Sequence, residues 1–256
     1  MKQILTVFSF LFISCMLVAQ PRQYTVANIH AHNDYEHNIP FSDAYALGIG
    51  SIEADVHWIR DTLFVAHGSK ELRADVLFQS AYLQKLNDAV KANNGHPYAD
   101  GKRFLQLLID IKTDSLQTLK EVIREIELFP LLVNNPMVHF VITGNQPDPK
   151  DFDAYPSWLL FDGKINQPDH LRQTGRIGLF SANFSLYSKW KDMGEIPEAD
   201  LPAIKASIEK AHLLHKAFRF WGVPDNPTVW AIMKQLGVDY INTDHIAEAA
   251  DFINVH

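Results

Sequence analysis

Eight short runs of apolar and β-branched residues recur along the chain, and stretches with helical periodicity lie between them. Runs of about four to eight such residues are typical of buried strands. They lie at Val26–His30, Ser51–His57, Phe104–Ile111, Met137–Thr143, Trp158–Phe161, Ile177–Ala182, Ala217–Trp221 and Tyr240–Thr243. Eight strands that alternate with helices predict an α/β fold, a single-domain (β/α)₈ TIM barrel. An open doubly wound sheet is the main alternative, although no G-x-G-x-x-G loop follows the first run.

Helices are predicted where apolar residues recur three and four positions apart, as in Ser115–Glu127 and Leu201–Leu214. The longest connection runs from Gly68 to Gly101 and carries one predicted helix at Leu83–Asn93. We therefore interpret residues 68–101 as a short insertion in the barrel rather than as a second domain.

The first 19 residues have the pattern of an export signal. Lys2 precedes an almost continuous apolar stretch from Ile4 to Ala19, as in a signal peptide. An uncleaved membrane anchor and a lipid-modified Cys15 are the alternatives. Cleavage after Ala19 predicts a mature domain of residues 20–256 in the periplasm or outside the cell. Since Cys15 is the lone cysteine, that domain would be exported without disulfides.

The charge balance excludes one large class of partner. The chain has 256 residues, with 23 Lys and Arg against 30 Asp and Glu, and its formal net charge is −7. A nucleic-acid-binding surface is basic, so we expect no nucleic-acid partner. We also expect no stable membrane span beyond the signal. An anionic substrate would need a metal ion or local cations, because the net charge does not attract it.

Acidic residues stand where the predicted barrel strands end. Glu53, Asp55 and His57 alternate with apolar residues in the second run, so all three side chains point to one face. Asp110 stands near the end of the third run. Three carboxylates at the edge where the active sites of such barrels lie predict a site for one divalent cation, Mg²⁺ or Ca²⁺. Structural salt bridges are the alternative.

Two histidines and a lysine complete the predicted site. His32 follows the first strand, and His67 ends a short extended segment after the second. An imidazole titrates near about pH 6.5, so two of them beside a phosphoryl group can act as base and acid. Lys112 shares a strand face with Asp110 and would offer a charge to an anion, unless the two simply pair at the surface.

The order of these motifs resembles the superfamily of glycerophosphodiester phosphodiesterases and phosphatidylinositol-specific phospholipases C. The matching segments are Ala31-His32, Pro40, Glu53-Ala54-Asp55, Val65-Ala66-His67, Leu108–Lys112, Phe220-Trp221 and Gly237–Asp244. The resemblance implies a (β/α)₈ barrel with one Mg²⁺ or Ca²⁺ ion and a histidine pair. It assigns catalysis to His32 and His67, the metal to Glu53, Asp55 and Asp110, and substrate binding to Lys112 and Trp221.

The chain departs from the glycerophosphodiesterase pattern at several positions. Asn33-Asp34 replaces an Arg-Gly pair after the first histidine, so an expected phosphate-binding arginine is missing. Gly68 and the aspartate at position 110 are more similar to the sphingomyelinase D branch. The His-Asn-Asp-Tyr run from His32 to Tyr35 most resembles an uncharacterised branch.

We expect a metal-dependent phosphodiesterase, a phosphoric diester hydrolase of lipid metabolism that cleaves a glycerophosphodiester or a phospholipid. Two rival functions are kept. A metal-dependent amidohydrolase would use His30-Ala31-His32 with Asp244. An exported headgroup-binding module would keep the pocket without turnover. We expect His30 itself to be structural and to hold a metal ligand in place.

Overall fold

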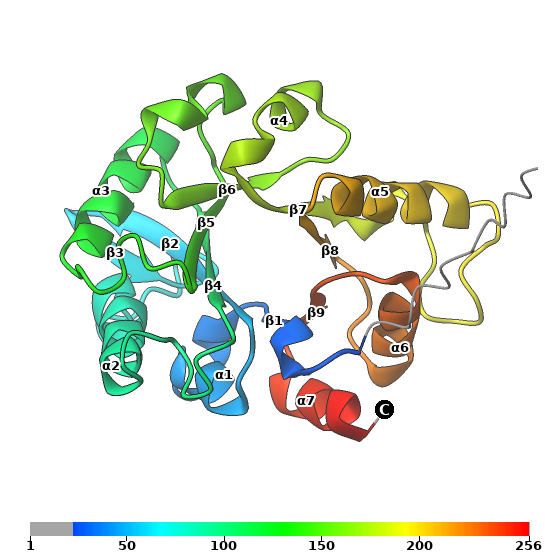
Figure 1. Ribbon diagram of the computed structural model, residues 1–256, viewed down its shortest axis with the longest axis horizontal. Helices are drawn as coiled ribbons and strands as arrows, with labels where there is room; N and C mark the ends of the chain where they lie inside the picture. Colours follow the sequence, from blue (N-terminus) through cyan, green and yellow to red (C-terminus); the bar gives the residue numbers. More distant parts are fainter. Residues whose placement is uncertain (1–22, 256) are drawn as a thin grey trace, which may run out of the picture.

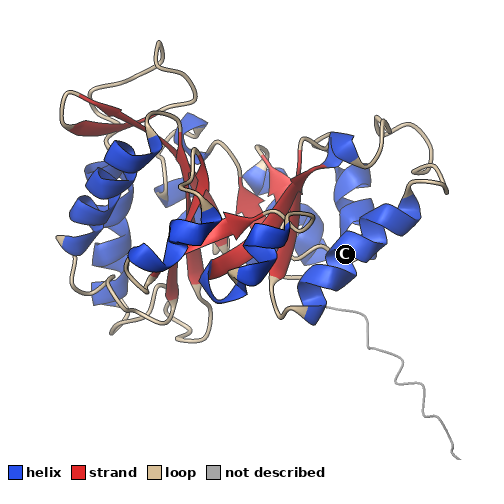
Figure 2. Cartoon of the chain, turned by 90° about the horizontal axis from the view of Figure 1, so that it is seen from above, coloured by secondary structure: helices blue, strands red, loops and turns tan. Residues whose placement is uncertain are grey.

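Eight parallel strands form a nearly closed barrel with helices around it, which confirms the predicted fold (Figure 1). The computed structural model describes residues 23–255, so the predicted export signal lies outside the described residues. Within this range, none of the helices is both long and apolar enough to cross a bilayer. Figure 2 shows the strands inside and the helices on the flanks.

The strands are β1 (Ile29–Ala31), β2 (Ser51–Ile59), β3 (Thr62–Val65), β4 (Leu105–Ile111), β5 (Val138–Gly144), β6 (Leu159–Gly163), β7 (Ile177–Asn183), β8 (Ala217–Trp221) and β9 (Ile241–Thr243). The α-helices are α1 (Ser42–Leu47), α2 (Gln84–Ala92), α3 (Ser115–Glu127), α4 (Pro168–Arg172), α5 (Leu201–Leu213), α6 (Pro227–Leu236) and α7 (Ile246–Val255). A π-helical stretch, η3 (Gln79–Leu83), leads into α2. Short 3-10 turns are η1 (Val26–Asn28), η2 (Asp34–Glu36), η4 (Pro149–Ala154), η5 (Thr174–Arg176) and η6 (Phe184–Leu186).

The strands pair in the order β8-β7-β6-β5-β4-β2-β1-β9, and a bridge between Arg219 and Tyr240 joins the two ends. The first strand begins later than the sequence indicated, because residues 26–28 form a 3-10 turn. Thr25 and Asn28 cap this turn reciprocally, the threonine hydroxyl accepting from Ala27 and the asparagine oxygen accepting from Thr25. The cap turns the chain before it enters the barrel.

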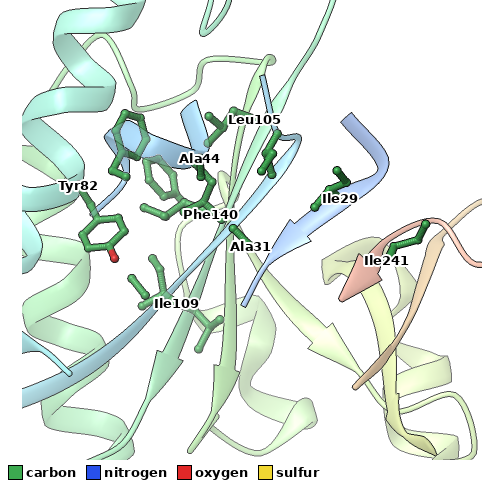
Figure 3. Packing of buried hydrophobic residues seen from close by; sticks show 14 of the residues in the cluster. Ile29, Ala31, Ala44, Tyr82, Leu105, Ile109, Phe140 and Ile241 are labelled. Carbon is green, nitrogen blue, oxygen red and sulfur yellow. The ribbon is translucent and has the colours of Figure 1, made fainter. Parts of the chain in front are cut away.

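Apolar residues form two separate layers on either side of the barrel wall. The larger layer lies between strands and helices, and Figure 3 shows Ile109 and Phe140 with Tyr82 in this cluster. A smaller cluster of Leu108, Val141, Leu179 and Tyr240, with Leu160 and Ala217 packed on it, has the alternate side-chain register and fills the barrel interior. These apolar side chains close the barrel interior at this level, which we call the floor of the barrel, so the interior is not an open channel.

Polar residues stand two positions beyond that floor on each of these strands. The step from floor to polar position runs from Leu108 to Asp110, Val141 to Thr143, Leu160 to Asp162, Leu179 to Ser181, Ala217 to Arg219 and Tyr240 to Asn242. A step of two residues keeps a strand side chain on the same face and moves it along the barrel axis. The carboxyl ends of the strands therefore carry a ring of polar side chains above an apolar floor.

The strand β3 lies outside the parallel barrel and pairs with β2 in an antiparallel hairpin. Arg60 and Asp61 form its two-residue turn, with φ values of 50° and 61°. Two successive left-handed residues are the geometry of a type I′ hairpin turn. The returning strand leads the chain back to His67, next to the ends of the barrel strands.

Truncation of the outer core should destabilise the protein strongly. Ile109 is fully buried, with 0% of its surface exposed, so Ile109→Ala should cost about 2–5 kcal/mol of unfolding free energy because it leaves a cavity. Leu116 in α3 is 60% exposed, and Leu116→Ala should change stability by less than about 0.5 kcal/mol. Urea unfolding followed by circular dichroism measures both values. Equal losses would contradict the assignment of the core.

Candidate active site

A cavity of about 910 Å³ opens at the carboxyl ends of the barrel strands. Active sites of (β/α)₈ barrels lie at this face. The structure brings all the site residues that the sequence indicated to this one cavity. They are His32, Glu53, Asp55, His67, Asp110, Lys112 and Trp221.

The three predicted acids converge. Glu53, Asp55 and Asp110 each offer an oxygen, and these oxygens lie within 4.8 Å of one another. The Oδ1 atoms of Asp55 and Asp110 are buried and have no hydrogen-bond partner. Carboxylates this close repel one another, and buried oxygens without partners are costly, so a cation relieves both penalties. An all-oxygen donor set of this kind can hold a divalent metal ion.

A buried network fixes the position of Glu53. His30 Nε2 and Glu53 Oε2 are 2.8 Å apart, and His30 Nδ1 lies 2.7 Å from Ser51 Oγ. Gln106 Nε2 donates to the same Ser51 oxygen at 2.7 Å, so the serine hydroxyl is free to donate to Nδ1 and Nε2 carries the proton for Glu53. His30 thus has the structural role we expected. Because both of its ring nitrogens are engaged, the amidohydrolase pattern lacks its first metal ligand.

Glu53 also pairs with a buried arginine that the sequence analysis missed. Arg219 Nη1 donates to Glu53 Oε2 at 3.1 Å and to Asn242 Oδ1 at 3.0 Å. Burial alone would raise the pKa of Glu53, but the His30 hydrogen bond and the Arg219 charge outweigh it and hold that pKa well below its usual range. Burial and Arg219 together lower the pKa of His30 to about 3, so His30 is neutral. Glu53 is therefore the permanently ionised member of the triad.

Lys112 bridges the other two acids. Its Nζ lies 2.9 Å from Asp55 Oδ2 and 2.7 Å from Asp110 Oδ2. Burial and the neighbouring Glu53 and Asp110 charges raise the pKa of Asp55 to about 8, although Lys112 opposes this. Burial would lower the pKa of Lys112, but Asp55 and Asp110 raise it to about 12. The lysine is a fixed positive charge beside the triad, and it leaves both unpaired Oδ1 atoms available.

His32 is held by a carboxylate from the far end of the chain. Its Nδ1 lies 2.7 Å from Asp244 Oδ1, and its Nε2 lies 3.9 Å from Glu53 Oε1. Burial lowers the pKa of His32, but the hydrogen bond with Asp244 and the charge of Glu53 raise it overall. Asp225 Oδ2 in turn accepts from the Asp244 backbone N–H at 2.7 Å. The ring is thus oriented with Nε2 facing the acids.

His67 lies near Asp55 and is much more exposed than His32, with 62% of its side chain exposed. Its Nδ1 lies 3.7 Å from Asp55 Oδ2 and 3.3 Å from the hydroxyl of Tyr35. That hydroxyl also lies 2.9 Å from Asp55 Oδ2. Burial and the Asp55 charge raise the pKa of Tyr35, so its hydroxyl keeps its proton.

Three residues of the His-Asn-Asp-Tyr run, His32, Asn33 and Tyr35, have partners at the site. Asn33, at φ 49°, donates through Nδ2 to Asp244 at 3.3 Å and accepts from the Tyr35 hydroxyl at 2.6 Å. Asp34 accepts from the backbone N–H of Phe41 at 2.6 Å. The run therefore ties His32, its carboxylate partner and the acid triad together.

Reasoning from sequence did not assign Arg219, Asp244 and Tyr35 to this site. Asp244 was named only in a matching segment and for the rival amidohydrolase, and Tyr35 only as part of the His-Asn-Asp-Tyr run. Arg219 lies between two phenylalanines on a predicted strand. The strand alternation that places the acids on the inner face therefore also points the side chain of Arg219 inward. Arg219 supplies a positive charge to this cavity, where the arginine expected after the first histidine is missing. The pairing of His32 with Asp244, 212 positions apart, had no comparable local signal.

The substitution Gly144→Ala should displace Asp110 and weaken divalent-ion binding. Gly144 has a φ of +71°, and a Cβ there would collide with Asp110 Oδ1 and the Ile111 carbonyl oxygen. We expect a loss of affinity of at least about tenfold, the scale on which supporting groups tune metal sites. Calorimetric titration with Mg²⁺ and with Ca²⁺ measures it.

Gly175→Ala is the matched control, because a Cβ at Gly175 meets no atom within 4 Å. It should leave ion affinity unchanged. If Gly144→Ala folds and binds both ions as tightly as this control, Asp110 does not belong to the ion site.

Comparisons with known proteins agree with this geometry. The model of the AIM6-like phosphodiesterase domain matches residues 20–140, which include the acid triad, and that of the Glycerophosphoryl diester phosphodiesterase family matches residues 217–247. Altered inheritance of mitochondria protein 6 of Kluyveromyces lactis is 27% identical, over 89% of this chain and 72% of that protein. A homolog of that protein from Arthroderma benhamiae is also 27% identical, over 88% of this chain and 83% of its own length.

The fold is also that of a solved enzyme. The crystal structure of a glycerophosphodiester phosphodiesterase from Parabacteroides distasonis superimposes with a TM-score of 0.56, covering 89% of this chain and 96% of that one. At 14% identity this likeness concerns the fold alone. Motif order, both family models and the barrel agree, and in all three respects the chain is similar to the glycerophosphodiester phosphodiesterase-like superfamily.

Proposed function

We propose that the chain is a metal-dependent phosphodiesterase that cleaves a glycerophosphodiester or a phospholipid-type diester. The observation that carries the proposal is that two imidazoles, His32 beside Glu53 and His67 beside Asp55, share one cavity with the acid triad. The similarity of the chain to the glycerophosphodiester phosphodiesterase-like superfamily supports the same reaction class. Since fold alone does not specify chemistry, the proposal rests on this site.

His32 is the proposed general base. Asp244 holds its Nδ1, so Nε2 is free to take the proton of an attacking water or substrate hydroxyl. The carboxylate also stabilises the imidazolium that forms, as in other histidine–carboxylate pairs. The attacking oxygen then forms its bond to phosphorus while the bond to the leaving oxygen breaks.

His67 is the proposed general acid. It lies at the open side of the cavity, and protonated His67 would give its proton to the departing alkoxide, which has a direct path to solvent there. Tyr35 orients the ring, because its hydroxyl contacts His67 Nδ1 and Asp55 together. The two imidazoles thus exchange their protonation states in one turnover.

Cationic groups prepare the cavity for a phosphate. Lys112 is a fixed positive charge beside Asp55 and Asp110, and Arg219 is another beside Glu53. A divalent ion held by Glu53, Asp55 and Asp110 would supply further charge neutralisation at the phosphate oxygens. These charges explain how an acidic chain can accept an anionic substrate.

Loss of either imidazole should abolish most turnover. His32→Ala and His67→Ala are each expected to lower kcat by at least about 100-fold, the usual scale for a group that transfers a proton. Phosphorus-31 NMR of a panel of glycerophosphodiesters, lysophospholipids and sphingomyelin measures turnover and distinguishes cyclic from linear products. His215→Asn, a change at an exposed residue outside the cavity, serves as the control. Near-wild-type cleavage by either alanine variant would overturn the histidine mechanism.

Removal of divalent ions should stop the reaction reversibly. Treatment with EDTA leaves the three acids without a compensating ion, so we expect turnover to fall to background and to return on addition of Mg²⁺ or Ca²⁺. Glu53→Gln should stay inactive after re-addition, because it removes the permanently charged ligand. Full activity in the presence of chelator would exclude a metal-dependent reaction.

A further inference from the structure

The third residue of the His-Asn-Asp-Tyr run, Asp34, has no role in the mechanism described above. Its side chain is fully buried, with 0% of its surface exposed, and it does not line the cavity. An aspartate is almost never fully buried unless its carboxyl group is paired. The contacts of this carboxyl group therefore indicate why an acid stands at this position.

Asp34 ties together the two ends of the loop between β1 and α1. Its Oδ2 accepts from the backbone N–H of Phe41, the residue before α1, at 2.6 Å. Lys85, in α2, donates from Nζ to the carbonyl oxygen of Pro40 at 2.6 Å. The ring of Phe41 meets the ring of Tyr82 edge-on, with 6.3 Å between the centroids. The η3–α2 segment, which belongs to the insertion, thus holds the same end of the loop that Asp34 holds.

Phe41 has a strained backbone, with a φ of 66° and a ψ of −48°. A bulky residue at positive φ is a genuine outlier, and such strain persists only where the surrounding structure holds it in place. The groups that hold it are the carboxyl group of Asp34 and two side chains of the η3–α2 segment, Tyr82 and Lys85. The strain is therefore evidence that these contacts impose one shape on the loop.

The residue after Asp34 reaches the site from this loop. The hydroxyl of Tyr35 lies 2.6 Å from Asn33 Oδ1, 2.9 Å from Asp55 Oδ2 and 3.3 Å from His67 Nδ1. Because Asp34 stands between Asn33 and Tyr35, a fixed Asp34 limits the movement of both neighbours. A loop released at Asp34 would let the tyrosine hydroxyl move away from the imidazole.

We propose that Asp34 is a positioning residue, which anchors the loop between β1 and α1 and thereby holds the Tyr35 hydroxyl against His67. The effect on turnover rests on the proposed function, in which Tyr35 orients His67.

The anchor needs an acceptor oxygen rather than a charge. Burial raises the pKa of Asp34 to about 7, although the Phe41 N–H and the nearby Tyr82 hydroxyl lower it. A carboxyl group can accept from the Phe41 N–H whether or not it carries a proton. An amide of the same shape offers an oxygen as well, so asparagine should replace Asp34 and alanine should not.

Nitrogen-15 NMR of the histidine rings tests the anchor without turnover. In the full chain labelled at its histidines, the loss of a signal in His67→Gln assigns His67 Nδ1. Asp34→Ala should move this resonance in the direction in which Tyr35→Phe moves it, and Asp34→Asn should leave it near the wild-type position. An unchanged resonance in folded Asp34→Ala, or an equal shift in Asp34→Asn, contradicts the proposal.

Kinetic measurements test whether Asp34 acts through Tyr35. Asp34→Ala should lower kcat at least about tenfold with little change in KM, because misplacing a catalytic group by about 1 Å can cost about 100-fold. Combined with Tyr35→Phe it should cost nothing further, since residues that act through one contact are not additive. Additive losses would contradict the proposal. If the NMR shifts hold as expected and no diester is cleaved, the anchor stands and the proposed function fails.

Lys85→Met covers the case in which Asp34→Ala does not fold. It removes the contact with Pro40 and should move the His67 resonance in the same direction. Two controls should leave that resonance in place. Lys91→Met is the same substitution at an exposed position of α2, and Ile177→Ala empties part of the core at the start of β7, where the isoleucine is fully buried. If Asp34→Ala does not fold and Lys85→Met behaves like Lys91→Met, the proposal fails.

Discussion

Electrostatic repulsion between three converging carboxylates is the constraint on which the rest of the site depends. Parallel strands force Glu53, Asp55 and Asp110 to the same end of the barrel, where their oxygens lie within 4.8 Å of one another. Arg219 and Lys112 offset part of the repulsion, and His30 fixes Glu53 in its ionised form. The oxygens still without partners are those that a divalent ion would contact. The charged partners and the protonation states of these side chains thus depend largely on the repulsion among the three carboxylates.

Strand periodicity made a large part of this structure predictable. The run Ala217–Trp221 has the bounds that the structure gives it, and Ser115–Glu127 has the bounds of α3. The alternation in Glu53, Asp55 and His57 identified an inward face, because a period of two is a property of the strand itself. His57 nevertheless does not line the cavity, and its Nε2 lies 3.0 Å from the carbonyl oxygen of Ala66, the residue after β3.

What escaped prediction depends on how the barrel closes. Asp244 reaches His32 only because β9 lies beside β1, and Arg219 reaches Glu53 only across the barrel interior. Neither contact has a trace in local composition. The first strand was misjudged at its start for a different reason, since the reciprocal cap of Thr25 and Asn28 overrides the apolar character of Val26.

The two imidazoles have unequal mechanical support. His32 sits at the seam where the first and last strands meet, and its backbone N–H donates to Thr243 at 3.0 Å. His67 is carried instead by a two-stranded ribbon that branches from the wall, turning at Arg60 and Asp61. Related sequences can therefore lengthen, shorten or turn the β2–β3 hairpin without disturbing the closure of the barrel. The distance between the two imidazoles can thus change in evolution separately from the barrel.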